Sequence, residues 1–293
     1  MTDNRNKAAI FVLLGQSNAV GHGILMEEKD KITVPMKNVF GLSRELNQSY
    51  DNKKLNWSGY LSAGMNLAEQ QDDTYSVANC LAQLWQDEID AGNPRNLPDL
   101  YIIQIAIGAQ GVTEKYMWYP DREKKLVPGV LGTVDISLFP FTVGILSLVK
   151  KSFEEMNLTP EFLLHWRGGE EDGSVPVDEY SRIVKGLYDR LFDGFYEALG
   201  EKIPTVIHKF PYIERCLEMD SSGSSLRTIS YANEFFEKFA KERDNITLFN
   251  VRKAPHYIPN TRQHGIFIED AVHYTPETNR WVAQLILEEY PFR

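Results

Sequence analysis

Ser17 follows a short apolar run and is the first candidate for a chemical role. Residues Ala8–Leu14 read AAIFVLL, and Gly15-Gln16-Ser17-Asn18 follow them directly. Such a run is typical of a buried parallel strand, and the turn after a strand in an open α/β sheet lies at the edge where ligands bind. A serine there can be a nucleophile if a base reaches it. A serine that only caps the next helix would fit the same residues.

Asp270 and His273, far downstream, are the candidate orienting carboxylate and base. Their three-residue spacing suits one turn of helix or a tight loop, in which the carboxylate can hold the imidazole. An imidazole titrates near physiological pH, so His273 could take and return a serine proton. The pair alone is a weak signal, because a surface pair near the start of the last helix fits it equally well.

Gly15-Gln16-Ser17-Asn18 with Gly21, taken together with Asp270 and His273, resembles the first and last blocks of the SGNH hydrolases. The pattern is most similar to the sialate O-acetylesterase and acetylxylan esterase group, carbohydrate esterase family 6. Its first block reads G-Q-S-N-x-x-G and its last D-x-x-H, and both are complete here. Gln16 and Asn18, beside the nucleophile, are expected to support the site or to touch substrate.

Two middle blocks of that group are matched in part. Its Gly-Gly-Ser/Thr stretch, with a tryptophan a few residues later, corresponds to Gly111-Val112-Thr113 followed by Trp118. Its W-x-Q-G-E-x-D block corresponds to residues 166–172, which read WRGGEED. The second glycine is therefore Val112 and the glutamine is Gly168. The blocks keep the family's order and span nearly the whole chain.

The resemblance implies a serine hydrolase that needs no metal or organic cofactor. It makes Ser17 the nucleophile, His273 the general base and Asp270 the carboxylate that orients the base. The backbone N–H groups of Ser17 and Gly111 carry over as donors of an oxyanion hole. The family's third donor, a side-chain amide, has no counterpart at Gly168, and loss of one such donor typically costs ~10²–10³-fold in turnover.

Side chains beside this gap are candidates to replace the missing donor. Arg167 is the first of them, and Gln110 and Asn18 are the others. The resemblance also makes Glu170 a residue that braces the site. The alternative is that the acidic run at residues 170–172 is a solvated turn, which is the expectation for Glu171.

Aromatic side chains near these blocks suit either sugar binding or packing. Tyr116, Trp118 and Tyr119 follow the second block, and Trp57 and Tyr60 lie in an earlier polar stretch. Flat apolar rings match the C–H face of a sugar while their polar edges stay wet. The alternative is that they pin long loops to the body. Trp118 is the first candidate for a substrate contact because it matches the family position.

Composition limits the class of protein. The chain has 293 residues and 43% hydrophobic content, which predicts a single domain, 1–293, with loop insertions near 46–66 and 116–133. The formal net charge of −10 disfavours nucleic-acid binding, because an acidic chain repels phosphate backbones. Two isolated cysteines, Cys80 and Cys216, predict buried reduced thiols rather than a zinc site or a disulfide framework.

The first apolar run is too short to be a membrane segment. It ends at Leu14 after seven residues, whereas a membrane span needs about twenty. It also lies at the lower limit for a signal peptide, and no small-x-small cleavage pattern follows. We therefore expect no membrane partner and a cytoplasmic protein.

Alternating strands and helices predict the fold. Five apolar runs are typical of buried strands: Ala8–Leu14, Leu100–Ile107, Phe162–Trp166, Pro204–Phe210 and Ile246–Val251. Helical spacing of apolar residues appears over Val77–Ile89, Tyr180–Phe195 and Trp281–Ile286, the last after Pro276. This predicts a three-layer α/β/α sandwich, flavodoxin-like, with a mostly parallel five-stranded sheet. His165 and His208, inside two of these strands, are expected to be buried imidazoles.

These observations predict hydrolysis of an acetyl or other short acyl ester on a carbohydrate. A sugar-binding protein on a weakened esterase scaffold is the alternative, motivated by Gly168. Among enzymes, an SGNH lipase or thioesterase is the second choice. The sugar, the acetylated position and the oligomeric state are not specified by the sequence.

Overall fold

A seven-stranded sheet forms the centre of the protein, in the order β3-β2-β4-β1-β7-β8-β9. The computed structural model describes residues 6–23, 25–69, 73–124, 126–128, 134–174, 177–211 and 224–292. All neighbours pair in parallel except β3, which runs antiparallel to β2 at one edge. The strands are β1 (Lys7–Gly15), β2 (Val39–Leu42), β3 (Trp57–Gly59), β4 (Asp99–Ala106), β7 (Thr159–Arg167), β8 (Thr205–His208) and β9 (Ile246–Phe249). A separate antiparallel pair is formed by β5 (Leu126–Pro128) and β6 (Val134–Ile136).

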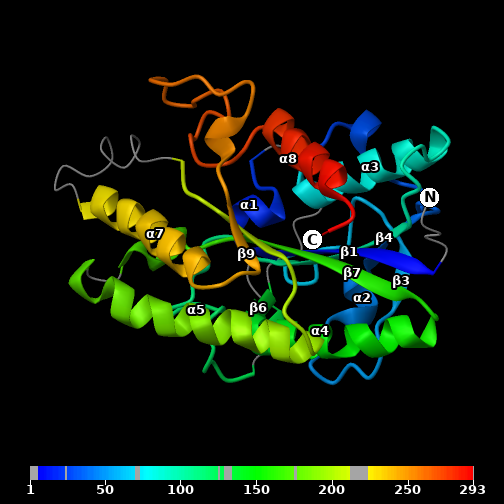
Figure 1. Ribbon diagram of the computed structural model, residues 1–293, viewed down its shortest axis with the longest axis horizontal. Helices are drawn as coiled ribbons and strands as arrows, with labels where there is room; N and C mark the ends of the chain where they lie inside the picture. Colours follow the sequence, from blue (N-terminus) through cyan, green and yellow to red (C-terminus); the bar gives the residue numbers. More distant parts are fainter. Residues whose placement is uncertain are drawn as a thin grey trace.

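Helices cover both faces of the sheet (Figure 1). The long helices are α3 (Val77–Asp90), α4 (Leu138–Glu155), α5 (Val177–Leu199), α7 (Ser224–Lys241) and α8 (Pro276–Glu289). Two short ones are α1 (Ser17–Val20) and α2 (Arg44–Asn47). Helices α3 and α8 lie together on one face, and α4, α5 and α7 lie on the other. The result is a sandwich of three layers.

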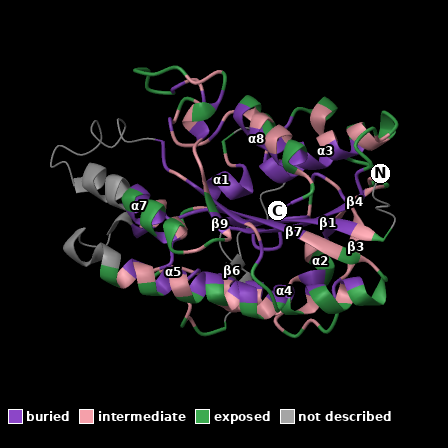
Figure 2. Ribbon diagram, in the orientation of Figure 1, coloured by how far each residue is buried: buried purple, intermediate pink, exposed green. Residues whose placement is uncertain are grey.

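Strand β1 is buried between the two helical layers, as Figure 2 shows. Successive side chains of a strand point to opposite faces. Phe11 and Leu13 accordingly pack in the cluster that contains α3 and α8, whereas Val12 and Leu14 pack in the one that contains α4, α5 and α7. All four side chains are fully buried. A run without polar residues is therefore what a central parallel strand requires.

The predicted sandwich is confirmed, and each of the five predicted strands is present. The predicted strand count is wrong, because β2 and β3 were not anticipated. Strand β2 has four residues and includes Gly41, and β3 has three, so neither gives a clear periodic signal. The segment 46–66, predicted as a loop, holds β3 and the end of α2. In the second predicted loop, 116–133, β5 is formed, and residues 125 and 129–133 lie outside the described part.

Helices α3, α5 and α8 match the predicted periodic segments, while α4 and α7 were missed. The α4 sequence is apolar through much of its length and contains Pro140 and Gly144, which hide a helical period. The caps of the predicted helices are conventional. The Ser76 side chain accepts from Asn79 N–H in a capping box at α3, and Thr275 caps α8 ahead of Pro276 at its first turn.

The chain crosses from one side of β1 to the other between β4 and β7. At such a switch point the loops that leave neighbouring strands diverge and form a crevice at the carboxyl ends. Three segments meet there: Gly15–Ser17 after β1, Gly108–Gly111 after β4, and Gly168–Glu170 after β7. The three matched sequence blocks that follow strands therefore converge on one edge.

Cys80 is a buried free thiol on α3, and burial raises its pKa to about 12. The other cysteine, Cys216, lies outside the described residues. None of the helices in the described ranges combines the length and apolarity needed to cross a membrane.

His165 and His208 form a buried imidazole pair between β7 and β8. His165 Nδ1 and His208 Nε2 lie 3.1 Å apart, and both side chains are almost fully buried. Burial, with the nearby Arg167 charge, lowers the pKa of His165 to about 3 and that of His208 well below its usual value. Both rings are therefore neutral in the folded protein at neutral pH, as the sequence led us to expect of buried imidazoles.

This pair predicts how stability depends on pH. Unfolding lets both imidazoles bind protons below about pH 6.5, so the free energy of unfolding falls as pH drops from 6.5 toward the folded pKa values. The buried Asp172 carboxyl opposes this, because its folded pKa is raised to about 7 and unfolding releases its proton. Two histidines outweigh one carboxyl, so we expect a net loss of about 1.4 kcal/mol per pH unit.

Urea unfolding of wild type and His208→Gln between pH 4.5 and 7 measures this effect. The variant lacks one of the buried imidazoles and should show a pH slope smaller by up to about 1.4 kcal/mol per unit. Equal slopes for the two proteins would contradict the assignment.

Candidate active site

The turn after β1 requires glycine and presents Ser17. Gly15 has φ of 140°, and a Cβ there would lie 2.2 Å from the Arg167 carbonyl oxygen. That close approach lets Gln16 N–H donate to the same carbonyl at 2.9 Å. Ser17 then opens α1 with 7% of its surface exposed. The serine is thus held at the end of β1 by direct contact with the end of β7.

Asp270 and His273 form a hydrogen-bonded pair in a tight loop. His273 Nδ1 lies 2.5 Å from Asp270 Oδ2, and Asp270 Oδ1 accepts from the backbone N–H groups of Val272 and His273 at 2.7 and 2.9 Å. Ala271 takes a left-handed conformation, with φ of 56°, to close the turn. Burial alone would raise the pKa of Asp270, but these backbone donors and the imidazole hold it below its usual value. The carboxylate is therefore ionised beside the ring.

Asn18 ties this loop to the serine turn. Its Nδ2 donates to the Val272 carbonyl and its Oδ1 accepts from Tyr274 N–H, both at 3.1 Å. Val272 and Tyr274 are the residues on either side of His273. Asn18 therefore hydrogen-bonds the loop both before and after the imidazole. No hydrogen bond joins Ser17 Oγ to His273 Nε2 within the described contacts. Such bonds commonly tighten only once substrate is bound.

Two backbone donors are available near the serine. Among the described residues, neither Ser17 N–H nor Gly111 N–H donates to a protein acceptor. A Cβ at Gly168 would be 3.5 Å from Gly15 Cα, and glycine supplies no side-chain donor at this point.

Asp172 supports the turn that carries Gly111. Its Oδ1 accepts from Val112 N–H at 2.8 Å and Thr113 N–H at 3.4 Å, and Oδ2 accepts from Tyr188 O–H at 3.2 Å. The side chain is fully buried, and this burial raises its pKa to about 7 against the opposing effect of those bonds. The sequence placed Asp172 in register with the third block without assigning it this contact.

The three candidates for a substitute donor make other bonds. Arg167 Nη1 donates to Asn279 Oδ1 on α8 at 3.2 Å, and its guanidinium lies over the Tyr274 ring, 4.6 Å from the centroid. Gln110 Nε2 donates to the Gly108 carbonyl at 3.3 Å. Asn18 Nδ2 donates to Val272, as described above. Arg167 thus packs beneath the loop that holds His273.

Trp118 is not an exposed platform for a sugar. It is fully buried, its Nε1 donates to the Gly15 carbonyl at 3.1 Å, and its ring packs on Trp166. Tyr60 is also fully buried, and Trp57 packs between Tyr101 and Phe153. The expectation of a substrate contact is wrong for Trp118, because no face of its ring is open. These three rings therefore match the alternative interpretation, in which aromatic side chains pack loop segments against the protein core.

Residues 170–172 are not a simple solvated turn. They open the short 3-10 helix η3 (Glu170–Ser174). Glu171 is half-buried, and the Tyr116 hydroxyl lies 3.1 Å from its carbonyl oxygen and 3.0 Å from its Oε2, so it is solvated only in part. Glu170 is close enough to raise the pKa of Asp172 through its charge. The Gln16 side chain is buried, and its Oε1 has no hydrogen-bond partner among the described residues.

A second histidine–carboxylate pair lies beside His273, and only one of its members could be considered from the sequence. His22 Nε2 lies 2.6 Å from Glu69 Oε1, and the His22 and His273 ring centroids are 5.7 Å apart. Glu69 Oε2 also accepts from Gly108 N–H at 2.8 Å. Glu69 belongs to none of the sequence blocks. It lies 47 residues from His22 in the sequence, so their hydrogen bond can be seen only in the folded structure.

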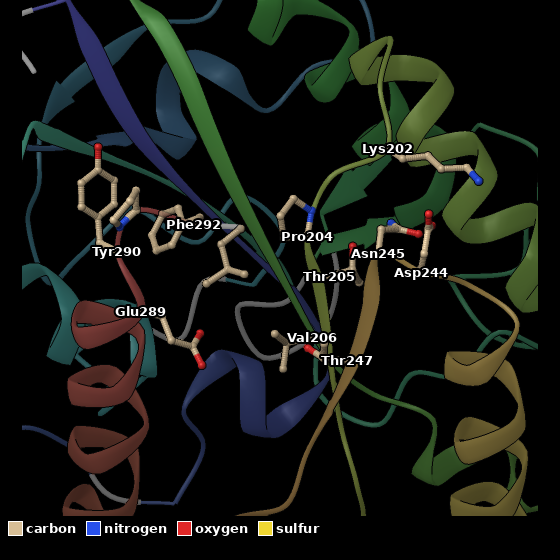
Figure 3. Close-up of a pocket in the computed structure, with 12 residues that line it drawn as sticks. Lys202, Pro204, Thr205, Val206, Asp244, Asn245, Thr247, Glu289, Tyr290 and Phe292 are labelled. Atoms are coloured by element: carbon tan, nitrogen blue, oxygen red, sulfur yellow. The ribbon is translucent and has the colours of Figure 1, made fainter. Parts of the chain in front are cut away.

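A cavity of about 780 Å³ lies elsewhere, against the first residues of β8 and β9 (Figure 3). Thr205, Val206 and Thr247 form one wall, and the segment Tyr290–Phe292 after α8 forms another. The active-site candidates follow the opposite, carboxyl ends of the strands. None of the described residues that line this cavity is serine, cysteine or histidine, and none belongs to the matched sequence blocks.

Metal coordination is not indicated by the described side chains. No group of three or more histidine, cysteine, aspartate or glutamate residues is arranged there to hold a metal ion.

Comparison with known proteins gives likenesses of structure only. No family model matches the chain, and no curated protein matches its sequence. The crystal structure of NanS matches with 12% identity and a TM-score of 0.57, over 98% of both chains. A protein from Arabidopsis thaliana matches with 14% identity and a TM-score of 0.55, over 96% of this chain and 98% of its own. These likenesses show the fold alone.

The contacts of Asp172 generate a test of the oxyanion side. Asp172→Ala leaves the buried Val112 N–H without an acceptor, which we expect to cost about 1–3 kcal/mol of stability and to displace Gly111. Asp172→Asn keeps an oxygen for that donor and should retain most of the stability. Urea unfolding of both variants measures this. Wild-type stability in Asp172→Ala would contradict the role.

Proposed function

We propose that this protein is a serine esterase that hydrolyses acetyl or other short acyl esters of carbohydrates. The observation that carries the proposal is the His273–Asp270 pair, whose loop is hydrogen-bonded to Asn18, the residue next to Ser17. A nucleophile, a base and a carboxylate that orients the base are what serine-hydrolase chemistry requires. The four sequence blocks that resemble the SGNH esterases support the same reading.

In the first step Ser17 Oγ attacks the ester carbonyl carbon while His273 Nε2 takes its proton. Asp270 holds Nδ1–H, which fixes the tautomer with Nε2 free and stabilises the imidazolium. The Ser17 and Gly111 N–H groups donate to the oxygen that becomes negative. The bond from carbon to the alcohol oxygen then breaks, and His273 returns the proton to that oxygen. The alcohol leaves and Ser17 carries the acyl group.

In the second step water attacks the acyl carbon and His273 again accepts a proton. The bond to Ser17 Oγ breaks, Oγ is reprotonated, and the carboxylic acid leaves. The side chains act as base, acid and nucleophile without any further reagent. With two described donors, we expect slower turnover than a site with three would give, by ~10²–10³-fold.

Support for a carbohydrate as the alcohol comes from the third sequence block and from Tyr116. The Tyr116 ring is partly exposed, and its Cδ2 would lie 2.9 Å from a Cβ at Gly111. It therefore borders the turn that supplies an oxyanion donor. A ring edge at that position suits the C–H groups of a sugar, with its hydroxyl held by Glu171.

Ser17→Ala tests the nucleophile. We expect the variant to fold as wild type does and to lose at least about 10³-fold in acetate release from p-nitrophenyl acetate and from acetylated sugars. Retained esterase activity in Ser17→Ala would rule out the mechanism. Absence of Ser17-dependent release in wild type would favour the carbohydrate-binding alternative.

Asp270→Asn tests the orientation of the base. The amide Oδ1 can still accept from the Val272 and His273 N–H groups, so the loop should persist. Its NH₂ group faces Nδ1 and favours the tautomer whose Nε2 carries the proton, which cannot accept from serine. We expect about 10⁴-fold lower kcat with KM little changed. Wild-type kcat would contradict the role of Asp270.

A further inference from the structure

His22 and Glu69 form a coupled unit at the mouth of the site. Glu69 is nearly buried, with 5% of its side chain exposed, and its two oxygens bond His22 Nε2 and Gly108 N–H at 2.6 and 2.8 Å. Its backbone carbonyl accepts from Arg44 at 2.8 Å, so the residue is held at its backbone as well as at its carboxylate. His22 lies five residues after Ser17, just beyond α1, and its N–H donates to the Ser17 carbonyl at 3.0 Å.

The contacts of Glu69 decide the tautomer of His22. An ionised carboxylate only accepts hydrogen bonds, so Nε2 carries the proton that is directed to Glu69. In the tautomer with its single proton on Nε2, Nδ1 is a hydrogen-bond acceptor. Among the described residues the His22 ring bonds Glu69 through Nε2, no partner of Nδ1 is present, and 21% of the side chain is exposed. The ring beside His273 therefore has a second nitrogen that no described residue occupies.

The position of His22 indicates which part of a substrate it faces. Its ring and the His273 ring meet edge to face, with centroids 5.7 Å apart. In the proposed mechanism His273 protonates the alcohol oxygen as it leaves, so the alcohol half of the ester must lie against that ring. A hydroxyl on the carbon next to the ester oxygen is then within reach of His22. Gly108 leaves room for the ring, since a Cβ there would lie 2.5 Å from His22 Cε1.

We propose that His22, oriented by Glu69, is a specificity-determining residue that accepts a hydrogen bond from a hydroxyl neighbouring the ester on the alcohol half of the substrate. This inference rests on the proposed esterase function and extends it. It makes polyhydroxylated alcohols better substrates than simple ones, through a contact made by Nδ1 rather than by the catalytic groups.

Glu69→Gln separates this role from packing. The Gly108 N–H needs an acceptor, so it orients the new amide with its oxygen toward Gly108 and its NH₂ toward His22. His22 must then accept at Nε2 and carry its proton on Nδ1. The turn and the ring stay in place while the acceptor at Nδ1 becomes a donor. His22→Phe keeps a ring in the same space and removes both nitrogens.

The experiment compares three esters in wild type, Glu69→Gln and His22→Phe. The probes are a mono-O-acetylated methyl pyranoside with a free neighbouring hydroxyl, its analogue with that hydroxyl replaced by hydrogen, and p-nitrophenyl acetate. We expect wild type to prefer the hydroxylated sugar over the deoxy analogue by about tenfold in kcat/KM, and His22→Phe to lose that preference. Glu69→Gln should keep it, because the hydroxyl can instead accept a hydrogen bond from Nδ1–H. Hydrolysis of p-nitrophenyl acetate, which lacks the hydroxyl, measures any loss that is common to all esters.

Glu161→Gln is the matched control, because this carboxylate bonds Lys7 and Tyr290 away from the carboxyl ends of the strands. It should keep the wild-type preference. Equal losses on all three esters in His22→Phe, or an unchanged preference in that variant, would overturn the inference. Failure of the esterase proposal itself is distinguishable, because wild type would then release no Ser17-dependent acetate from any probe.

Discussion

The two hydrogen bonds of the Asn18 side chain are the constraint on which the site depends. They join the turn after the first strand to a loop 254 and 256 residues later, on either side of His273. Nothing in the local conformation of either segment brings them together. The first strand must be central and the last helix must begin just after the loop for both bonds to form. The side-chain amide of Asn18 thus joins the turn that carries Ser17 to the loop that carries His273.

The rest of the architecture follows from keeping β1 in the middle of the sheet. Its side chains alternate between two apolar clusters, so it is anchored on both faces. Its last residue, Gly15, meets the end of β7 so closely that only glycine fits. Carboxylates then fix the loops at this edge: Asp172 holds one turn, Glu69 another, and Asp270 the imidazole.

Much of this could be predicted from the sequence, because buried parallel strands and helical faces have strong periodic signals. The five apolar runs are strands, and the Asp270–His273 spacing suited either a turn of helix or a tight loop, of which the tight loop is present. The strands β2 and β3 were missed because three or four residues carry no period. Helix α4 was missed because its apolar residues surround most of its circumference.

The contacts that could not be predicted join segments that are distant in sequence. Trp118 matched a motif and yet is fully buried under Gly15, since a pattern gives residue type but not exposure. Glu69 belongs to no motif, and its bonds to His22 and Gly108 exist only once three loops have met. Arg167 was the first candidate for an oxyanion donor, and its described bond goes to Asn279 on the last helix.

Covalent labelling tests the central claim most directly. An organophosphate such as diisopropyl fluorophosphate phosphorylates a serine that is activated by an adjacent base, and peptide mass spectrometry locates the adduct. The account predicts one adduct per chain, on the peptide that contains Ser17, and none in a His273→Ala variant that is otherwise folded. An adduct on another residue, or an active esterase that carries no adduct on Ser17, would contradict it.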